Sequence, residues 1–171
     1  ALTRRAFLAG ASALAAMPRR AAGSSAQRIA AVDWAMLETA LALGIVPVAA
    51  TELVHYRRWV IVPEMPDTVA DLGLRGAPNL EVLVKAAPDL ILSSHFYAGI
   101  RHRLVRIAPV VDSTINVPGG NPYQRALKET AELGNRLGVP EAARDLIGRT
   151  EAAMDALVGT MEPRPVLLVS L

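Results

Sequence analysis

The stretch Asp71-Leu-Gly-Leu-Arg75-Gly-Ala-Pro-Asn79-Leu-Glu81-Val-Leu83 contains, in order, the end of a strand, a tight turn and the start of a helix. Gly73 and Gly76 bracket Arg75, and glycine adopts unusual backbone angles at low cost. Asn79 is a favourable N-cap residue, and apolar residues follow it at helical spacing. The stretch therefore predicts one arginine held on a loop between a strand and a helix. Because ligands bind at the carboxyl ends of strands in α/β sheets, Arg75 is a candidate for holding an anionic ligand oxygen.

Strands and helices alternate on both sides of this stretch. Apolar runs predict strands over residues 28–32, 46–50, 69–74, 89–93 and 109–111. Capping residues and helical spacing predict helices over residues 33–43, 80–87, 100–107, 121–137 and 140–161, with loops at 51–68 and 94–99. This alternation predicts an α/β fold, and we expect a mainly parallel sheet flanked by helices.

The composition excludes several kinds of site. The 171 residues suffice for one domain with a sizeable core, and the absence of cysteine excludes disulfides, thiolate metal sites and a cysteine nucleophile. The formal charge is +2, but four of the 18 basic residues lie in residues 1–22, which contain no acid. Residues 23–171 contain the remaining 14 basic residues and all 16 acidic residues, which gives this part a net charge of −2. The sequence therefore predicts no nucleic-acid partner.

Residues 1–26 have the pattern of a twin-arginine export signal. Arg4 and Arg5 precede an uncharged apolar run, which is shorter than the about 20 residues that a membrane span needs. Small residues at Ser24-Ser25-Ala26 suit a cleavage site. The alternative is a short basic amphipathic helix. We expect export, already folded, by the twin-arginine pathway.

The longest predicted helix starts at Pro140 and carries one continuous apolar stripe to about Met161. About 20 helical residues span about 30 Å. Residues 166–171 read as a new strand at the end of the chain. We therefore expect the chain to be the amino-terminal part of a longer protein.

Three residues of ligand-binding chemistry follow successive predicted strands: Trp59, Arg75 and Tyr97. If the strands are parallel, these residues meet at one rim of the sheet and offer two aromatic walls and one cation. Each also has a purely structural explanation. Trp59 could cover the core, Tyr97 could be an ordinary loop aromatic, and Arg75 could be solvated or paired with Glu81.

Catalytic and metal-binding patterns are absent from the sequence. His55, His95 and His102 form no metal-ligand pair, although His95 beside Tyr97 could serve a haem iron or a small anion. The sequence contains no GxSxG, P-loop or GxGxxG motif and no carboxylate spacing that demands a dyad. We predict no catalytic residue and no metal ligand.

Several motifs resemble one known family, the periplasmic ferric-hydroxamate (ferrichrome-type) siderophore-binding proteins of ABC importers. The resemblance covers residues 28–171 and rests on these motifs in order: Leu41-Ala-Leu-Gly-Ile-Val-Pro47, His55-Tyr-Arg-Arg-Trp59, Asp71-Leu-Gly-Leu-Arg75, Pro78-Asn-Leu-Glu81 and Arg106-Ile-Ala-Pro109. His95 and Phe96 depart from the family pattern.

The resemblance implies two α/β lobes joined by one long helix, with a siderophore in the cleft between them. It makes residues 27–139 the amino-terminal lobe, 140–162 the inter-lobe spine helix and 163–171 the first strand of a truncated second lobe.

By motif, the residues that contact the siderophore in this family fall on Trp59, Arg75 and Tyr97, and a permease-docking glutamate falls on Glu81. The implied protein is a monomeric periplasmic receptor that needs no cofactor, because iron arrives already chelated by the siderophore. Its partner is an inner-membrane ABC permease.

Other functions remain open from the sequence. A receptor of the same fold could carry a catecholate siderophore, haem or a corrinoid. An exported hydrolase would need its catalytic groups in the missing half, and an exported interaction protein would need no small-molecule cargo.

Overall fold

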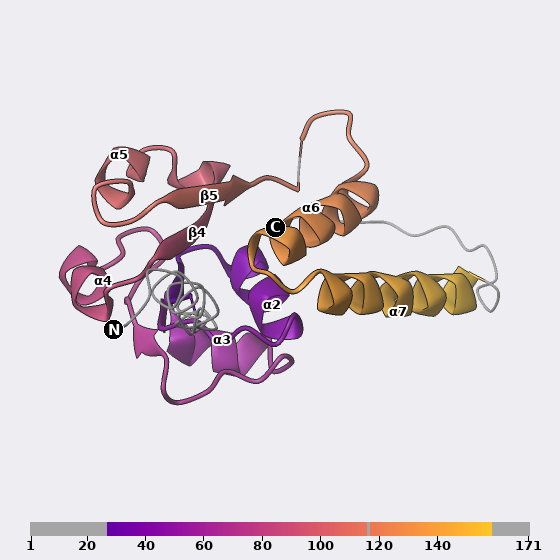
Figure 1. Ribbon diagram of the computed structural model, residues 1–171, viewed down its shortest axis with the longest axis horizontal. Helices are drawn as coiled ribbons and strands as arrows, with labels where there is room; N and C mark the ends of the chain where they lie inside the picture. Colours follow the sequence, from indigo (N-terminus) through magenta and orange to yellow (C-terminus); the bar gives the residue numbers. More distant parts are fainter. Residues whose placement is uncertain (1–26, 116, 159–171) are drawn as a thin grey trace, which may run out of the picture.

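A computed structural model of the protein describes residues 27–115 and 117–158 (Figure 1). Within this part of the chain, parallel strands form one sheet in the order β3-β2-β1-β4-β5. The strands are β1 (Ile29–Ala31), β2 (Ala49–Ala50), β3 (Ala70–Asp71), β4 (Leu90–Ser94) and β5 (Val110–Ser113). In the central strand, Ala30 pairs with Ala49 on one side and with Ile91 on the other.

Helices follow the strands as the alternation predicted. They are α2 (Trp34–Ala42), α3 (Leu53–Trp59), α4 (Leu80–Ala86), α5 (Arg101–Leu104), α6 (Pro122–Arg136) and α7 (Pro140–Val158), with a 3₁₀ turn at His95–Tyr97. The parallel sheet flanked by helices is therefore confirmed.

Two cores lie on opposite faces of the sheet. Alternate residues of β1 point to opposite faces, as the strand period of two requires. Ile29 and Ala31 join a core with α2, α3, α6 and α7, whereas Ala30 joins a core with α4 and α5. The result is a three-layer arrangement of helix, sheet and helix.

The predicted helix starts depend on side-chain caps. Asp33 accepts a hydrogen bond from the backbone N–H of Met36, and Asn79 accepts from those of Glu81 and Val82. Asn121 caps α6 in the same way. Each cap satisfies a backbone donor that the first helical turn leaves without an intrahelical partner.

The prediction of a loop over residues 51–68 was wrong, because residues 53–59 form α3. Leu53 and Tyr56 are buried on one side of this helix, and Val60 packs against the same core. The helical spacing was present, but it extends over only two turns. Its N-cap residue Glu52 makes no side-chain cap, so the usual start signal is missing.

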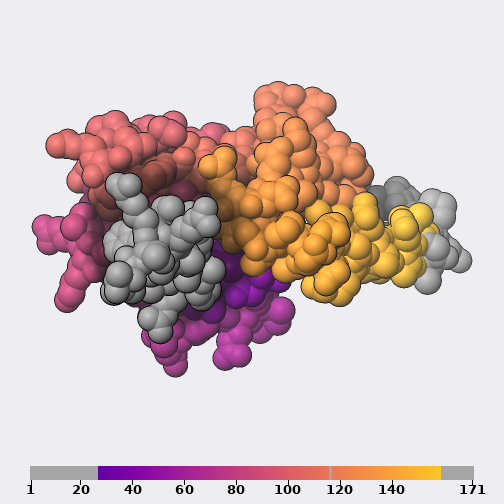
Figure 2. Space-filling view, in the orientation of Figure 1, coloured from indigo at the N-terminus to yellow at the C-terminus, as the bar shows by residue number. Residues whose placement is uncertain are grey.

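α7 packs on α6 only through its first half. Gly134 of α6 lies so close to Ala143 of α7 that a Cβ at position 134 would be 2.3 Å from the Ala143 Cβ. From residue 151 onward every described residue of α7 is exposed, and Figure 2 shows this end extending beyond the sheet and its covering helices. None of the described helices combines the length and the apolar character required to span a bilayer. The predictions for residues 1–26 and 159–171 lie outside the described residues.

Candidate functional site

A cavity of about 610 Å³ lies at the carboxyl ends of the strands. Segments that follow β1, β2, β3 and β4 all contribute to its lining, as the parallel sheet requires. Its lining residues are Asp33, Trp34, Ala35, Glu52, Arg75, Gly76, Phe96, Tyr97, Gly99 and Ile100. Arg75 and Tyr97, which the sequence predicted to meet, therefore share one cavity.

Hydrogen bonds to the backbone of Gly73 fix the turn that carries Arg75. The Asp71 Oδ1 atom accepts a hydrogen bond from the Gly73 N–H at 2.8 Å. Gly73 has a φ of 72°, a conformation that residues with a Cβ adopt at a cost. Its carbonyl accepts a hydrogen bond from the N–H of Glu52 at 2.8 Å, which ties the turn to the segment that follows β2.

The guanidinium group of Arg75 is held between a carboxylate and an indole. Its Nε donates to Glu52 Oε2 at 2.7 Å, and its Cζ lies 4.1 Å from the centroid of the Trp34 ring. It does not pair with Glu81. Among the described residues, no hydrogen bond uses its two terminal amino groups. Since a guanidinium has five N–H donors, most of its capacity remains for ligand oxygens.

Glu52 occupies an unusual backbone conformation at the edge of the cavity. Its φ of 51° and ψ of 46° place it in the left-handed region, which costs on the order of 1–3 kcal/mol for a non-glycine residue. Its side chain pairs with Arg75 instead of capping α3. A residue held in this way positions the arginine before any ligand arrives.

Trp34 forms a wall of the cavity at the first position of α2. Its Nε1 donates to the Thr51 carbonyl at 2.9 Å, and the Thr51 hydroxyl donates to the Val32 carbonyl at 2.9 Å. Its ring also meets the Tyr56 ring edge-on, with centroids 5.6 Å apart. These contacts fix the indole against which Arg75 lies.

Tyr97 is a buried phenol that keeps its proton across the physiological range. Burial is the main cause that raises its pKa, to about 12, and the charge of Asp33 adds to this effect. Arg75 acts in the opposite direction, as a nearby cation does. Tyr97 is therefore a neutral phenol on the cavity lining, and its hydroxyl interacts with the side chain of Thr51.

Trp59 lies at the end of α3 and not in a loop, which corrects the sequence prediction. It is absent from the cavity lining in the described part of the chain, but its ring meets Trp34 with centroids 6.3 Å apart. The His55 ring stacks on it at 5.0 Å with an interplanar angle of 6°. Trp59 thus extends the aromatic wall outward from Trp34, with 62% of its surface exposed.

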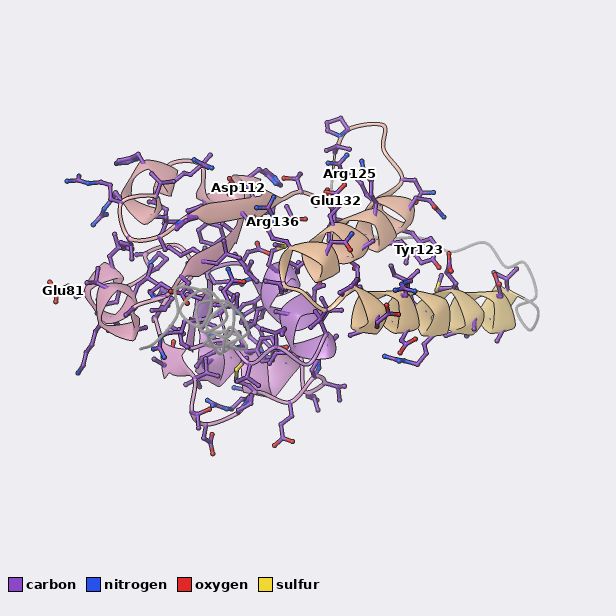
Figure 3. The ribbon with its side chains drawn as sticks, viewed as in Figure 1. Glu81, Asp112, Tyr123, Arg125, Glu132 and Arg136 are labelled. Carbon is purple, nitrogen blue, oxygen red and sulfur yellow. The ribbon has the colours of Figure 1, made fainter. Side chains whose placement is uncertain are left out.

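Glu81 lies apart from the cavity, on the first turn of α4. Its side chain is exposed and points away from the protein at the outer end of this helix (Figure 3). An acidic side chain in the first turn also interacts favourably with the helix dipole, which stabilises the helix by about 0.3–1 kcal/mol. Both a structural and a docking role are compatible with this position.

Sequence reasoning missed two residues that hold Arg75, namely Trp34 and Glu52. Both follow predicted strands at the same rim as the three candidates. The rule that selected Trp59, Arg75 and Tyr97 would have selected these residues as well, had it been applied to the first residues after each strand.

Metal ligation has no obvious site in the described part of the chain, where no three His, Cys, Asp or Glu residues cluster. His95 instead makes a hydrogen bond through Nδ1 with the Thr114 hydroxyl at 3.2 Å, and its ring lies 4.1 Å from that of Phe96.

A parallel α/β layer with a concave, partly aromatic cavity at its strand ends defines a ligand-binding lobe. The family described as Periplasmic binding protein matches residues 29–162. This match covers well over half of the chain, and the protein belongs to this family.

One curated relative is named for the ligand that it binds. The chain is 35% identical over 158 residues to the iron(3+)-hydroxamate-binding protein FhuD of Escherichia coli, a match that covers 88% of this chain and 52% of FhuD. The chain therefore spans about half the length of this curated relative.

Solved structures agree with this assignment. FhuD of Vibrio cholerae bound to Fe³⁺–Desferal aligns with a TM-score of 0.75 and 34% identity, over 80% of this chain and 51% of that one. Staphylococcus aureus SirA aligns with a TM-score of 0.59 and 27% identity, over 76% of this chain and 46% of that one. The E. coli relative is named as an iron(3+)-hydroxamate-binding protein and the V. cholerae relative as a siderophore-binding protein.

Proposed function

We propose that this chain is the amino-terminal lobe of a non-catalytic periplasmic receptor that binds ferric hydroxamate siderophores. The observation that carries the proposal is the cavity shared by Arg75 and Tyr97, in a chain 35% identical to an iron(3+)-hydroxamate-binding protein. Arg75 would donate to hydroxamate oxygens that already coordinate the iron, and neutral Tyr97 would donate a second hydrogen bond. Trp59 and Trp34 would form the aromatic wall.

The salt bridge between Arg75 and Glu52 leaves the guanidinium group available to a ligand oxygen. A charge-assisted hydrogen bond from Arg75 contributes about 1.5–3 kcal/mol. The salt bridge between Arg75 and Glu52 is partly exposed, with side-chain exposures of 43% and 14%, so solvent screening keeps it near about 0–1 kcal/mol. A ligand oxygen can therefore compete for the guanidinium without a large loss elsewhere.

The remaining parts of the proposal concern delivery. We propose that Glu81 docks on an inner-membrane ABC permease, since it is exposed and lies away from the cavity. The receptor would act as a monomer and reach the periplasm by the twin-arginine pathway through residues 1–26. Residues 140–162 would be a spine that leads to a second lobe beginning at 163–171.

A fluorescence titration of the full-length protein with a gallium-loaded hydroxamate siderophore tests the proposal. Gallium avoids quenching by paramagnetic iron, and Trp34 beside Arg75 is an expected reporter. Trp59→Phe would remove the signal of the second tryptophan in residues 1–171. We expect saturable binding that Arg75→Ala weakens at least about tenfold, equivalent to about 1.4 kcal/mol. Arg103→Ala, which removes an exposed positive charge on α5, is the matched control and should bind as the parent does.

Lack of saturable binding would reject the hydroxamate cargo. Equal losses in the Arg75 and Arg103 variants would reject the site, since net charge alone would then explain the effect.

A further inference from the structure

A smaller pocket of about 110 Å³, here called the side pocket, shares Asp33, Ala35 and Phe96 with the main cavity. The ends of β4 and β5 supply most of its remaining lining, which consists of Met36, Ser94, His95, Ser113, Thr114 and Ile115. Because one water-sized group occupies about 30 Å³ in a liquid, the side pocket has room for a small polar group and the methylenes attached to it.

Asp33 brings a negative charge that no described cation neutralises. Its Oδ1 accepts from the Met36 N–H at 3.2 Å and its Oδ2 accepts from the Ser94 hydroxyl at 2.8 Å, and both donors are neutral. No ion pair of Asp33 is present within residues 27–115 and 117–158. Each carboxylate oxygen can still accept a further hydrogen bond.

Ser113 provides a second polar group without a partner. Its residue is 8% exposed, and its buried hydroxyl has no hydrogen-bond partner in the described part of the chain. An unsatisfied buried hydroxyl carries a desolvation cost of about 1–3 kcal/mol, which a ligand donor would relieve. Ser113 therefore contributes a buried hydroxyl whose hydrogen-bonding capacity is unused within the described part of the chain.

The lining charges of the two cavities favour a cation. Arg75 is the one lysine or arginine among the residues that line them, whereas Asp33 and Glu52 contribute two carboxylates, and Arg75 is paired with Glu52. Phe96 is 76% exposed on the wall between the cavities and offers an aromatic face, which attracts ammonium groups.

We propose that the side pocket binds a protonated amine of the ligand, so that the receptor prefers ferric hydroxamate siderophores that carry an ammonium group. This inference rests on the proposed function. Arg75 would hold the hydroxamate oxygens, while the ammonium group donates to Asp33 and Ser113 beside the Phe96 ring. An ammonium has three donors and no acceptor, which matches this set of groups.

Two ligands that differ only in this group test the assignment on the full-length protein. Gallium–desferrioxamine B has a free terminal ammonium, and its N-acetyl derivative has the same chelating chain without the charge. We expect the parent protein to bind the ammonium complex at least about fivefold more tightly by fluorescence titration or calorimetry. In Asp33→Asn, the ratio of the affinities for the ammonium complex and the N-acetyl complex should fall to within about twofold of unity.

Asp33→Asn is a suitable variant because asparagine caps helices as well as aspartate does, so α2 keeps its cap. Asp145→Asn, which removes an exposed carboxylate on α7, is the matched control and should leave the ratio unchanged. Ser113→Ala removes the hydroxyl without creating a new unsatisfied group and should reduce the ratio in part.

The outcomes separate the two proposals. Equal binding of both complexes by the parent, or a preference that survives Asp33→Asn, overturns the ammonium pocket and leaves the receptor function standing. Failure of both complexes to bind overturns the receptor function and this assignment together. Arg75→Ala should weaken both complexes to a similar degree.

Discussion

Arg75 is held in place before any ligand binds. The Arg75 Nε donates a hydrogen bond to Glu52, and the guanidinium group lies over the Trp34 ring. Each of these two interactions contributes at most about 1 kcal/mol at a partly exposed site. Both values are below the about 1.5–3 kcal/mol of a charge-assisted bond to a ligand. The two contacts therefore orient the side chain without competing strongly for its remaining donors.

Two buried tyrosines predict a loss of stability at alkaline pH. Burial raises the pKa of Tyr97 to about 12, with Asp33 adding to the effect, and burial followed by the charge of Glu38 raises that of Tyr56 to about 12. The pKa of a tyrosine in an unfolded chain is about 10. Between these values the unfolded chain releases protons that the folded chain keeps, so the free energy of unfolding falls as the pH rises.

We expect urea unfolding midpoints to decline from about pH 10 to about pH 12, with no contribution from these tyrosines below about pH 10. Tyr56→Phe should make the decline shallower. This variant should also raise stability near neutral pH, because the Tyr56 hydroxyl is fully buried and has no partner in the described part of the chain. A parallel decline in the parent and the variant would contradict the assignment.

At the scale of elements, the contact between α6 and α7 depends on the absence of a side chain. Gly134 lets the helix backbones approach, since a Cβ there would meet the Ala143 Cβ at 2.3 Å and the Val139 carbonyl at 3.3 Å. Gly148 lies within α7 and has open space where its Cβ would be. The same chemical change at these two positions therefore has opposite consequences.

Gly134→Ala should destabilise the protein by about 1–3 kcal/mol, because overpacking forces the two helices apart. Gly148→Ala should instead stabilise it by up to about 1 kcal/mol through helix propensity. Thermal or urea unfolding of both variants measures the difference. A destabilised Gly148→Ala, or a neutral Gly134→Ala, would show that the helices are not packed as described.

At the scale of the whole molecule, α7 extends past the rest of the described structure (Figure 2). Its residues 151–158 are all exposed, including Met154 at 41% and Val158 at 74%. Exposed apolar groups of this kind promote association with other apolar surfaces. In the proposed function, a second lobe would cover part of this helix.

Residues 27–158 expressed alone should therefore self-associate, as sedimentation velocity would detect. Met154→Gln combined with Val158→Gln should shift the segment toward monomer, because both changes remove exposed apolar surface. Glu151→Gln, on the same exposed half of α7, is the control and should leave association unchanged. A parent segment that stays monomeric at high concentration would contradict this prediction.

The sequence by itself determined the alternation of strands and helices, because caps, apolar runs and turn glycines are local signals. It also placed Arg75 and Tyr97 on one rim, since the carboxyl ends of parallel strands share an edge. It did not reveal α3, whose two turns carry no cap.

Only the tertiary structure decided which groups meet at that rim. Glu52 and Trp34 reach Arg75 across 23 and 41 positions of sequence, and the side pocket joins Asp33, Phe96 and Ser113 from three strand ends. Periodicity describes which face a residue occupies along its own element, whereas these contacts depend on strand order and side-chain direction across the sheet. They are therefore properties of the folded chain.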